Sequence, residues 1–293
     1  MRVLSYIGRA RHSLLLAVAL AVGSGRPALS QEITRGLDHI PVAVKDLEHS
    51  KADFEALGFV LKPGRPHSDG LRNQHVKFSD GTEIELITAP AATDALTEEY
   101  VDWIRDGDGP AFLGLYAPDL DAMESRLSRL GYAPDRKGDF ISFAKSSALH
   151  RFFFAKRQHS PTDRPDHFAH RNTALSLYGA WLADASVEQH LDALPAGTPA
   201  ERLACAPFGV ASKVLLLPEG EIVFLPAMAQ AASTRSIVAV TVAVQDLDVT
   251  QHVLNENHVP YRQVTGCARR SLWVEPSQAH GLWLEFLERA DTP

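Results

Sequence analysis

The chain has little cysteine and, after its first 30 residues, no long hydrophobic run. Its two cysteines among 293 residues are too few for the disulfide framework of a small secreted domain, and they lack the paired spacing of a zinc site. No later apolar run is long enough to span a bilayer. The phosphate-binding glycine loop and the Gly-x-Ser-x-Gly turn of serine hydrolases are also missing. These absences argue against a disulfide scaffold, a multispan membrane protein and a nucleotide-binding loop.

The N-terminus has the pattern of a leader rather than of a folded element. Arg2, Arg9 and Arg11 precede an apolar run over residues 14–22, and the small residues Ala28 and Ser30 stand at the two key positions before the expected cleavage point. This order is typical of a secretory signal peptide. We expect residues 1–30 to be removed, Gln31 to begin the mature chain, and the protein to be periplasmic or secreted. The alternative is an uncleaved membrane anchor.

The chain also lacks an excess of basic over acidic residues. The formal net charge is −7, and the leader contains four arginines and no acid, so its removal takes the charge to −11. A negative chain is poorly suited to bind nucleic acid or anionic membranes. We therefore expect a small-molecule substrate and no nucleic-acid or membrane partner after cleavage. The sequence leaves a homodimer open.

What the chain does contain is an internal repeat with an offset of 200 residues. Residues 40–47 and 240–247 share the pattern of an apolar strand followed by Asp-Leu, and Glu85 and Glu285 occupy matching places in a later strand. Such self-similarity indicates duplication of one supersecondary unit. The first copy has His39 where the last has Ala239, which makes the first copy the better candidate for chemistry.

Strand and helix patterns divide the chain into four βαβββ modules, called here modules one to four. The pattern predicts an α+β fold with curved mixed sheets rather than a doubly wound parallel sheet. The modules are predicted to pair into two domains, residues 36–156 and 167–288, joined by a linker at 157–166. The modules span residues 36–90, 110–156, 167–227 and 236–288.

Cys205 and Cys267 both fall in the predicted second strand of their modules. In an oxidising compartment they could form a bridge, but sequence does not supply the geometry. The other interpretation is two small buried apolar residues.

Strand alternation gathers polar residues on one face of module one. Successive residues of a strand point to opposite sides, so the face away from the helix carries His39, His75, Glu83 and Glu85. Neutral imidazole and carboxylate groups are suitable ligands for Fe, Mn, Zn, Ni or Co. A polar face that binds an organic ligand without metal is the alternative.

The chain resembles the vicinal oxygen chelate superfamily, and within it the glyoxalase-like members with two tandem domains. The resemblance rests on the stretches 37–47, 57–59, 80–86 and 170–174. It implies that the first-strand His39 and the last-strand Glu85 of module one bind a divalent metal ion. Module two offers no matching ligands, because phenylalanines stand in its last strand. Either His75 completes the set, which we favour, or Glu285 of module four does.

The resemblance also indicates the reaction. It implies a lyase or isomerase whose substrate chelates the metal through adjacent oxygens, with Glu83 as general base. Lys77, Arg72 and Asn73 are candidate substrate-binding residues, and Phe153 is a candidate aromatic wall. Two alternatives remain open, a ring-cleaving extradiol-type dioxygenase and a metal-free small-molecule binding or resistance protein.

Overall fold

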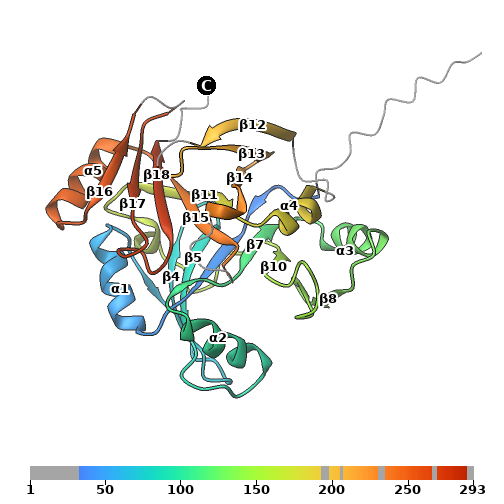
Figure 1. The fold of residues 1–293 in the computed structure, drawn as a ribbon. Helices are drawn as coiled ribbons and strands as arrows, with labels where there is room; N and C mark the ends of the chain where they lie inside the picture. Colours follow the sequence, from blue (N-terminus) through green and yellow to red (C-terminus); the bar gives the residue numbers. More distant parts are fainter. Residues whose placement is uncertain (1–32, 193–197, 205–206, 230–234, 266–268, 289–293) are drawn as a thin grey trace, which may run out of the picture. The chain divides into compact units, whose positions relative to one another are not determined.

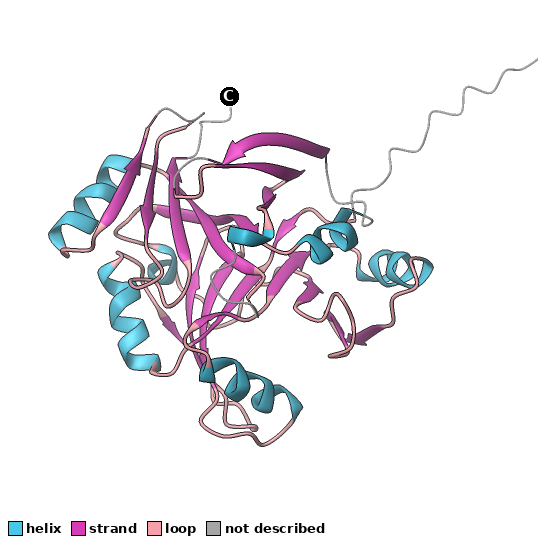
Figure 2. Cartoon of the chain, in the orientation of Figure 1, coloured by secondary structure: helices cyan, strands magenta, loops and turns pink. Residues whose placement is uncertain are grey.

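The computed structural model describes residues 33–192, 198–204, 207–229, 235–265 and 269–288. The predicted leader and both cysteines lie outside these ranges, so signal cleavage and the cysteine bridge remain predictions. The predicted α+β class is confirmed, with helices arranged outside mixed sheets (Figure 1, Figure 2). No helix in these ranges is both long and apolar enough to cross a membrane.

Each of the four modules contains the expected strand, helix and three further strands. Module one consists of β2 (His39–Ala43), α1 (Leu47–Ala56), β3 (Lys62–Pro63), β4 (Arg72–Lys77) and β5 (Glu83–Thr88). Module two consists of β7 (Leu113–Tyr116), α3 (Leu120–Arg129), β8 (Pro134–Lys137), β9 (Phe140–Phe143) and β10 (Phe152–Ala155). Two short strands, β1 (Gly36–Leu37) and β6 (Gly109–Pro110), and the helix α2 (Ala95–Arg105) complete the first half.

The second half repeats the order. Module three consists of β11 (Ala174–Leu182), α4 (Ala185–Asp192), β12 (Thr198–Ala204), β13 (Val210–Leu217) and β14 (Gly220–Phe224). Module four consists of β15 (Ile237–Val244), α5 (Leu247–Glu256), β16 (Tyr261–Val264), β17 (Ser271–Val274) and β18 (Trp283–Glu288). Two 3-10 turns, Pro165–Phe168 and Ala227–Ala229, lie in the connecting segments.

The Asp-Leu pairs of the repeat are helix starts. Asp46 is the N-cap of α1, and its carboxylate accepts hydrogen bonds from the backbone N–H groups of Glu48 and His49. Asp119 and Asp246 cap α3 and α5 in the same way. Each cap satisfies backbone donors that the helix leaves free and is worth about 1 kcal/mol.

The strands of each module pair in one fixed order. The first strand runs parallel to the last, as β2 does to β5, and the last three strands pair antiparallel. Modules one and two form separate five-stranded sheets, in the orders β3-β4-β5-β2-β6 and β1-β7-β10-β9-β8. Modules three and four share one eight-stranded sheet, because β11 pairs antiparallel with β15.

The two halves meet along the helices of modules one and four. Figure 1 shows α1 and α5 on the same side of the sheets, and Asn257 at the end of α5 donates to the Ala56 carbonyl at 2.7 Å. Phe59 stacks on Phe286 with ring centroids 5.8 Å apart. Phe59 and Phe286 both belong to one hydrophobic core that runs through all four modules. The predicted division into two domains stays a prediction.

The segment 170–174 serves this junction. The buried His170 accepts a hydrogen bond from the backbone N–H of Val60 at 3.0 Å, and its other ring nitrogen donates to the Lys77 carbonyl at 2.9 Å. Asn172 donates to the Leu57 carbonyl at 2.9 Å. The two residues therefore act as structural links between the start of module three and module one.

One face of the eight-stranded sheet of modules three and four carries a cluster of aromatic side chains. Trp181 and Trp273 are edge to face with centroids 5.3 Å apart, and Phe208 and Trp283 pack beside them. Beneath them, Trp181 donates to Thr241 at 2.9 Å, and Thr241 donates to Glu285 at 2.6 Å. This face thus differs in chemistry from the polar face of module one.

Candidate functional site

The predicted polar residues of module one do come together on one face. In the order β4-β5-β2, His39 is level with Glu83, and His75 is level with Glu85. Lys77 is opposite Glu83 on β4. We call the cluster of Asp38, His39, Asn73, His75, Lys77, Glu83 and Glu85 the module-one site.

His39 is held between two carboxylates. Its Nδ1 atom lies 2.6 Å from Asp38 Oδ2, and its Nε2 atom lies 3.8 Å from Glu85 Oε2. Burial alone would lower the pKa of His39, but the hydrogen bond to Asp38 and the charges of Asp38, Glu83 and Glu85 outweigh it and raise the pKa to about 9. The ring is therefore an imidazolium at neutral pH and a proton donor on both sides.

Glu83 is the partner of two basic groups. Its Oε2 atom lies 2.6 Å from Lys77 Nζ, and its Oε1 atom lies 3.5 Å from His75 Nδ1. Burial alone would raise the pKa of Glu83, but the interaction with His75 and the charges of His39, His75 and Lys77 hold it well below its usual range. Glu83 is consequently a carboxylate at neutral pH.

Glu85 has an amide as its nearest donor. Asn73 Nδ2 donates to Glu85 Oε1 at 2.6 Å, and both side chains are buried. The charge of Glu85 also acts on Tyr100 of α2. Burial, together with the charges of Glu85 and Glu99, raises the pKa of Tyr100 well above its ordinary value. The Oδ1 atom of Asn73 is buried and has no hydrogen-bond partner among the described residues. A buried polar atom in that state is usually satisfied by water or a ligand.

Module two closes the site with an aromatic ring. The Phe153 ring lies 4.6 Å from the His39 ring, and Phe140 packs 5.0 Å behind it. Gly114 on β7 makes this approach possible, because a Cβ there would lie 2.4 Å from the Phe153 ring and 2.9 Å from the His39 carbonyl oxygen. Phe153 thus occupies the predicted wall position.

The linker supplies a residue that no sequence pattern singled out. Asp163 is a half-buried residue whose side chain is only 6% exposed, with Oδ1 2.5 Å from Lys62 Nζ and Oδ2 3.9 Å from Lys77 Nζ. Its Oδ2 also accepts the backbone N–H of Ser160 at 2.7 Å. Sequence reasoning missed Asp38, Lys62 and Asp163. The only available signal was Asp38 preceding His39, since the other two meet the site through tertiary folding.

Two predicted residues are not brought to this face. Arg72 is exposed and, by strand alternation, points with Val76 toward the opposite side of β4. Glu285 lies in the eight-stranded sheet, where Thr241 bonds to it. The other predicted residues, including Asn73 and Lys77, share the module-one site.

The arrangement fits a divalent metal ion only in part. Side-chain ligands lie at about 2.0–2.2 Å from such an ion, so their donor atoms are roughly 3 Å apart. His39 and Glu85 come close to this, but His75 faces Glu83 instead. No group of three or more His, Cys, Asp or Glu side chains suited to a metal occurs in the ranges that the structure describes. This geometry departs from the predicted set of His39, His75 and Glu85.

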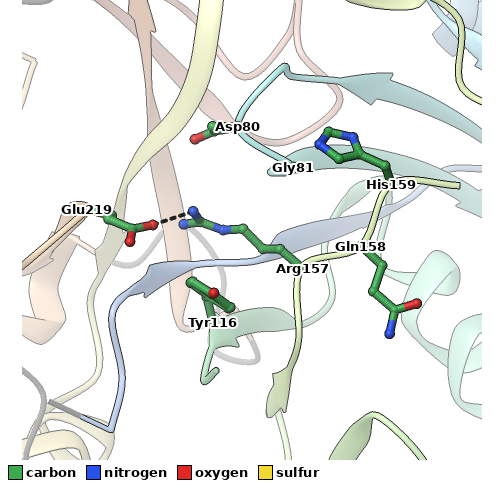
Figure 3. Close-up of a pocket in the computed structure, with 7 residues that line it drawn as sticks. All are labelled: Asp80, Gly81, Tyr116, Arg157, Gln158, His159 and Glu219. Carbon is green, nitrogen blue, oxygen red and sulfur yellow. Dashed lines mark hydrogen bonds and ion pairs between the residues drawn. The ribbon is translucent and has the colours of Figure 1, made fainter. Parts of the chain in front are cut away.

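A separate cavity lies at the junction of the two halves (Figure 3). Its volume is about 290 Å³, and its lining consists of Asp80, Gly81, Tyr116, Arg157, Gln158, His159 and Glu219. Arg157 donates to the Leu37 carbonyl at 2.8 and 2.6 Å and to Glu219 at 2.5 Å, and it stacks over Tyr116. Because its guanidinium bonds to Leu37 and Glu219, Arg157 of the linker connects the start of module one to module three.

The comparisons with known proteins agree with this architecture. The profile of the glyoxalase-like domain family matches residues 37–203, which is more than half of the chain. The chain therefore belongs to the glyoxalase-like domain family, within the vicinal oxygen chelate superfamily. A search of curated protein sequences found no match.

Solved structures show the same fold at low sequence identity. A triple mutant of 4-hydroxymandelate synthase from Streptomyces coelicolor is 10% identical, with a TM-score of 0.62 over 89% of this chain and 94% of the other. A 2,3-dioxygenase from a Pseudomonas species is 13% identical, with a TM-score of 0.60 over 89% and 95%. A fusion of a xylose isomerase-like barrel with 4-hydroxyphenylpyruvate dioxygenase is 12% identical with a TM-score of 0.61, and this chain spans 50% of its length.

Proposed function

We propose that this glyoxalase-like chain is an exported lyase or isomerase that transfers a proton on a small organic substrate with adjacent oxygen atoms. One observation carries the proposal: an imidazole and two carboxylates, His39, Glu83 and Glu85, share one largely buried face beneath the Phe153 ring. A donor and an acceptor of protons at one place are the requirement for general acid–base catalysis.

Each residue has a role in this proposal. The Glu83 carboxylate removes a proton from the carbon beside a substrate carbonyl group. Because His75 and Lys77 lower its pKa and make it a weak base, this step depends on the hydrogen bond from His39 that makes that carbon more acidic. The Nε2–H of His39 donates to the oxygen on which the enolate charge develops.

In an isomerase the proton returns to the former carbonyl carbon, while the hydroxyl group on the first carbon gives up its proton and becomes the new carbonyl. In a lyase a group on the carbon at the other side leaves with its bonding electrons as the carbon–carbon double bond forms, and it takes up a proton. Asn73 helps to orient the substrate, and Phe153 packs against its apolar part.

A metal ion would add Lewis-acid polarisation of the same oxygen. The sequence-based prediction of an Fe, Mn, Zn, Ni or Co ion rests on the superfamily resemblance. His75, the third ligand of the predicted set, faces Glu83 instead of His39 and Glu85. For this reason no step of the proposed reaction is assigned to a metal ion.

Proton exchange in heavy water tests the reaction directly. The protein is incubated in D₂O with a panel of small 2-oxo and 2-hydroxy acids and aldehydes, and deuterium uptake at carbon is followed by NMR. We expect uptake into at least one compound and a loss of about 10²–10⁴-fold in Glu83→Gln, the usual contribution of a positioned acid–base group. Uptake that survives in both Glu83→Gln and His39→Gln would remove this face from the reaction.

A second candidate is a ring-cleaving dioxygenase. It is favoured by structural similarity to catechol 2,3-dioxygenase, with a TM-score of 0.57 at 11% identity over 88% of this chain and 93% of the other. Oxygen uptake with catechol and ferrous iron, absent in His39→Ala, would establish it. Binding of an organic compound with neither exchange nor oxygen uptake would favour the remaining alternative, a metal-free binding protein.

Export is part of the proposal and rests on the sequence of residues 1–30. Intact-mass measurement of the protein in its host should give a chain that begins at Gln31 and lies outside the cytoplasm. A soluble cytoplasmic product that keeps Met1 would contradict export without affecting the proposed chemistry.

A further inference from the structure

The module-one site combines an incomplete set of metal ligands with a buried cation. Lys77 is only 7% exposed, and its ammonium nitrogen is 2.6 Å from Glu83 Oε2 and 3.9 Å from Asp163 Oδ2. Lysine is almost never so deeply buried unless it is paired. Because Lys77 is buried and paired with these carboxylates, its positive charge lies inside the module-one site and not on the protein surface.

The carboxylate oxygens that would ligate a metal ion already interact with other side chains of the protein. Glu83 faces both His75 and Lys77. Glu85 Oε1 accepts the amide of Asn73. On the side of module two, the Phe153 ring lies against His39 and offers no donor atom.

We propose that the ammonium group of Lys77 takes the electrostatic place of a divalent ion at the module-one site, and that it binds one carbonyl or carboxylate oxygen of the substrate. This inference rests on the proposed function only in taking the module-one face as the substrate site. An ammonium group has three N–H donors, and the two carboxylates use at most two of them. The third remains for a substrate oxygen. A side-chain cation with one free donor selects a single oxygen, where a metal ion with open positions would accept a chelating pair.

Cobalt binding tests the substitution without any turnover. The wild type, Lys77→Met and Lys77→Arg are loaded with Co²⁺ alone, desalted, and analysed for metal content and for the absorption of coordinated Co²⁺. The wild type and Lys77→Arg should retain no stoichiometric Co²⁺. Lys77→Met removes the resident charge and should bind Co²⁺ at least tenfold more tightly, about the lower end of what outer-shell partners contribute to metal affinity.

Two results would overturn the inference. One is a wild-type protein that retains one Co²⁺ per chain and loses it in His39→Ala. The other is a Lys77→Met protein that binds Co²⁺ no better than Lys77→Arg. If Lys77→Met does not fold, Lys77→Gln gives the same comparison, with thermal unfolding as the check on folding. Since the readout needs no substrate, a failure of the proton-exchange assay and a failure of this inference are distinguishable.

Discussion

At the scale of single residues, Asp38 decides the charge of His39. The two side chains are 2.6 Å apart, and Asp38 is the nearest of the three carboxylates around the ring. We expect Asp38→Asn to lower the pKa of His39 from about 9 toward the ordinary value near 6.5, because the variant removes a negative charge and keeps the shape.

Imidazole NMR signals followed over a pH titration would measure this shift. The signal of His252, an exposed residue on α5, serves as the internal reference in both proteins. An unchanged His39 titration in Asp38→Asn would show that Glu83 and Glu85 suffice to hold the charge.

Strand alternation alone predicts which residues share the polar face. The period of two places His39, Glu83 and Glu85 on the same side of the sheet. It says nothing about pairing within the face, so the contact of His75 with Glu83 was not predictable. The role of Asp163 was not predictable from the sequence either, because this linker residue contacts Lys62 only in the folded chain.

At the scale of elements, the linker is attached to module one by buried ion pairs. Asp163→Asn would leave the ammonium groups of Lys62 and Lys77 with less compensation, and breaking a buried pair in this way costs about 3–5 kcal/mol. We expect a loss of that order in the free energy of unfolding, measured by denaturant titration.

The same segment contains a matched control. Asp166 forms an exposed pair with Arg164, and solvent screens such pairs so that they contribute little to stability. Asp166→Asn should therefore unfold nearly as the wild type does. Equal effects of the two substitutions would mean that Asp163 is not a buried anchor.

The order of elements was largely predictable, and their assembly was not. The Asp-Leu pairs at Asp46 and Asp246 mark helix starts by a local mechanism, the capping of free N–H groups. Module boundaries follow from the same local signals. The joining of β11 to β15 in one eight-stranded sheet, while modules one and two keep separate sheets, depends on edge pairing between distant strands, for which the sequence has no local signal.

At the scale of the whole molecule, two histidines at the junction respond to pH in opposite directions. Burial holds the pKa of His170 at about 4, although its hydrogen bond to the Lys77 carbonyl acts the other way. The unfolded chain therefore binds a proton near pH 6.5, before the folded one does, and stability falls as the pH drops from 6.5 to 4.

Thermal unfolding at a series of pH values would show this acid-side loss, on the order of 3 kcal/mol at pH 4. His170→Asn should make the decline between pH 6.5 and 4 shallower than it is in the wild type. A wild-type stability that stays flat across this window would contradict the buried, neutral His170.

His280 acts on the alkaline side. It projects from the turn before β18 to lie 3.0 Å from Asp53 and 2.8 Å from Asp108, with Ser50 and His49 as its other polar neighbours. Burial alone would lower its pKa, but the bonds to Asp108 and Asp53 and their charges raise it above the ordinary value.

A raised pKa gives a stabilisation that is complete below about pH 6.5 and is lost as the pH rises through the folded-state pKa. Asp108→Asn should lower stability most below about pH 6.5, where His280 is charged, and should flatten the decline that follows as the pH rises, because the variant weakens the raised pKa of His280. The slope between pH 6.5 and 4, governed by His170, should stay in place. Equal loss at both ends would indicate a general weakening of the junction instead.

The aromatic face of the second half has a consequence for spectroscopy. The chain has four tryptophans, and Trp181, Trp273 and Trp283 stand together there, with neighbouring centroids 5.3 and 6.4 Å apart. Rings so close couple their excited states, so near-ultraviolet circular dichroism would be dominated by the eight-stranded sheet. Trp103, close to the guanidinium groups of Arg151 and Arg235 at 4.1 and 4.9 Å, emits from the half that holds the module-one site. The protein thus contains separate optical reporters for its two halves.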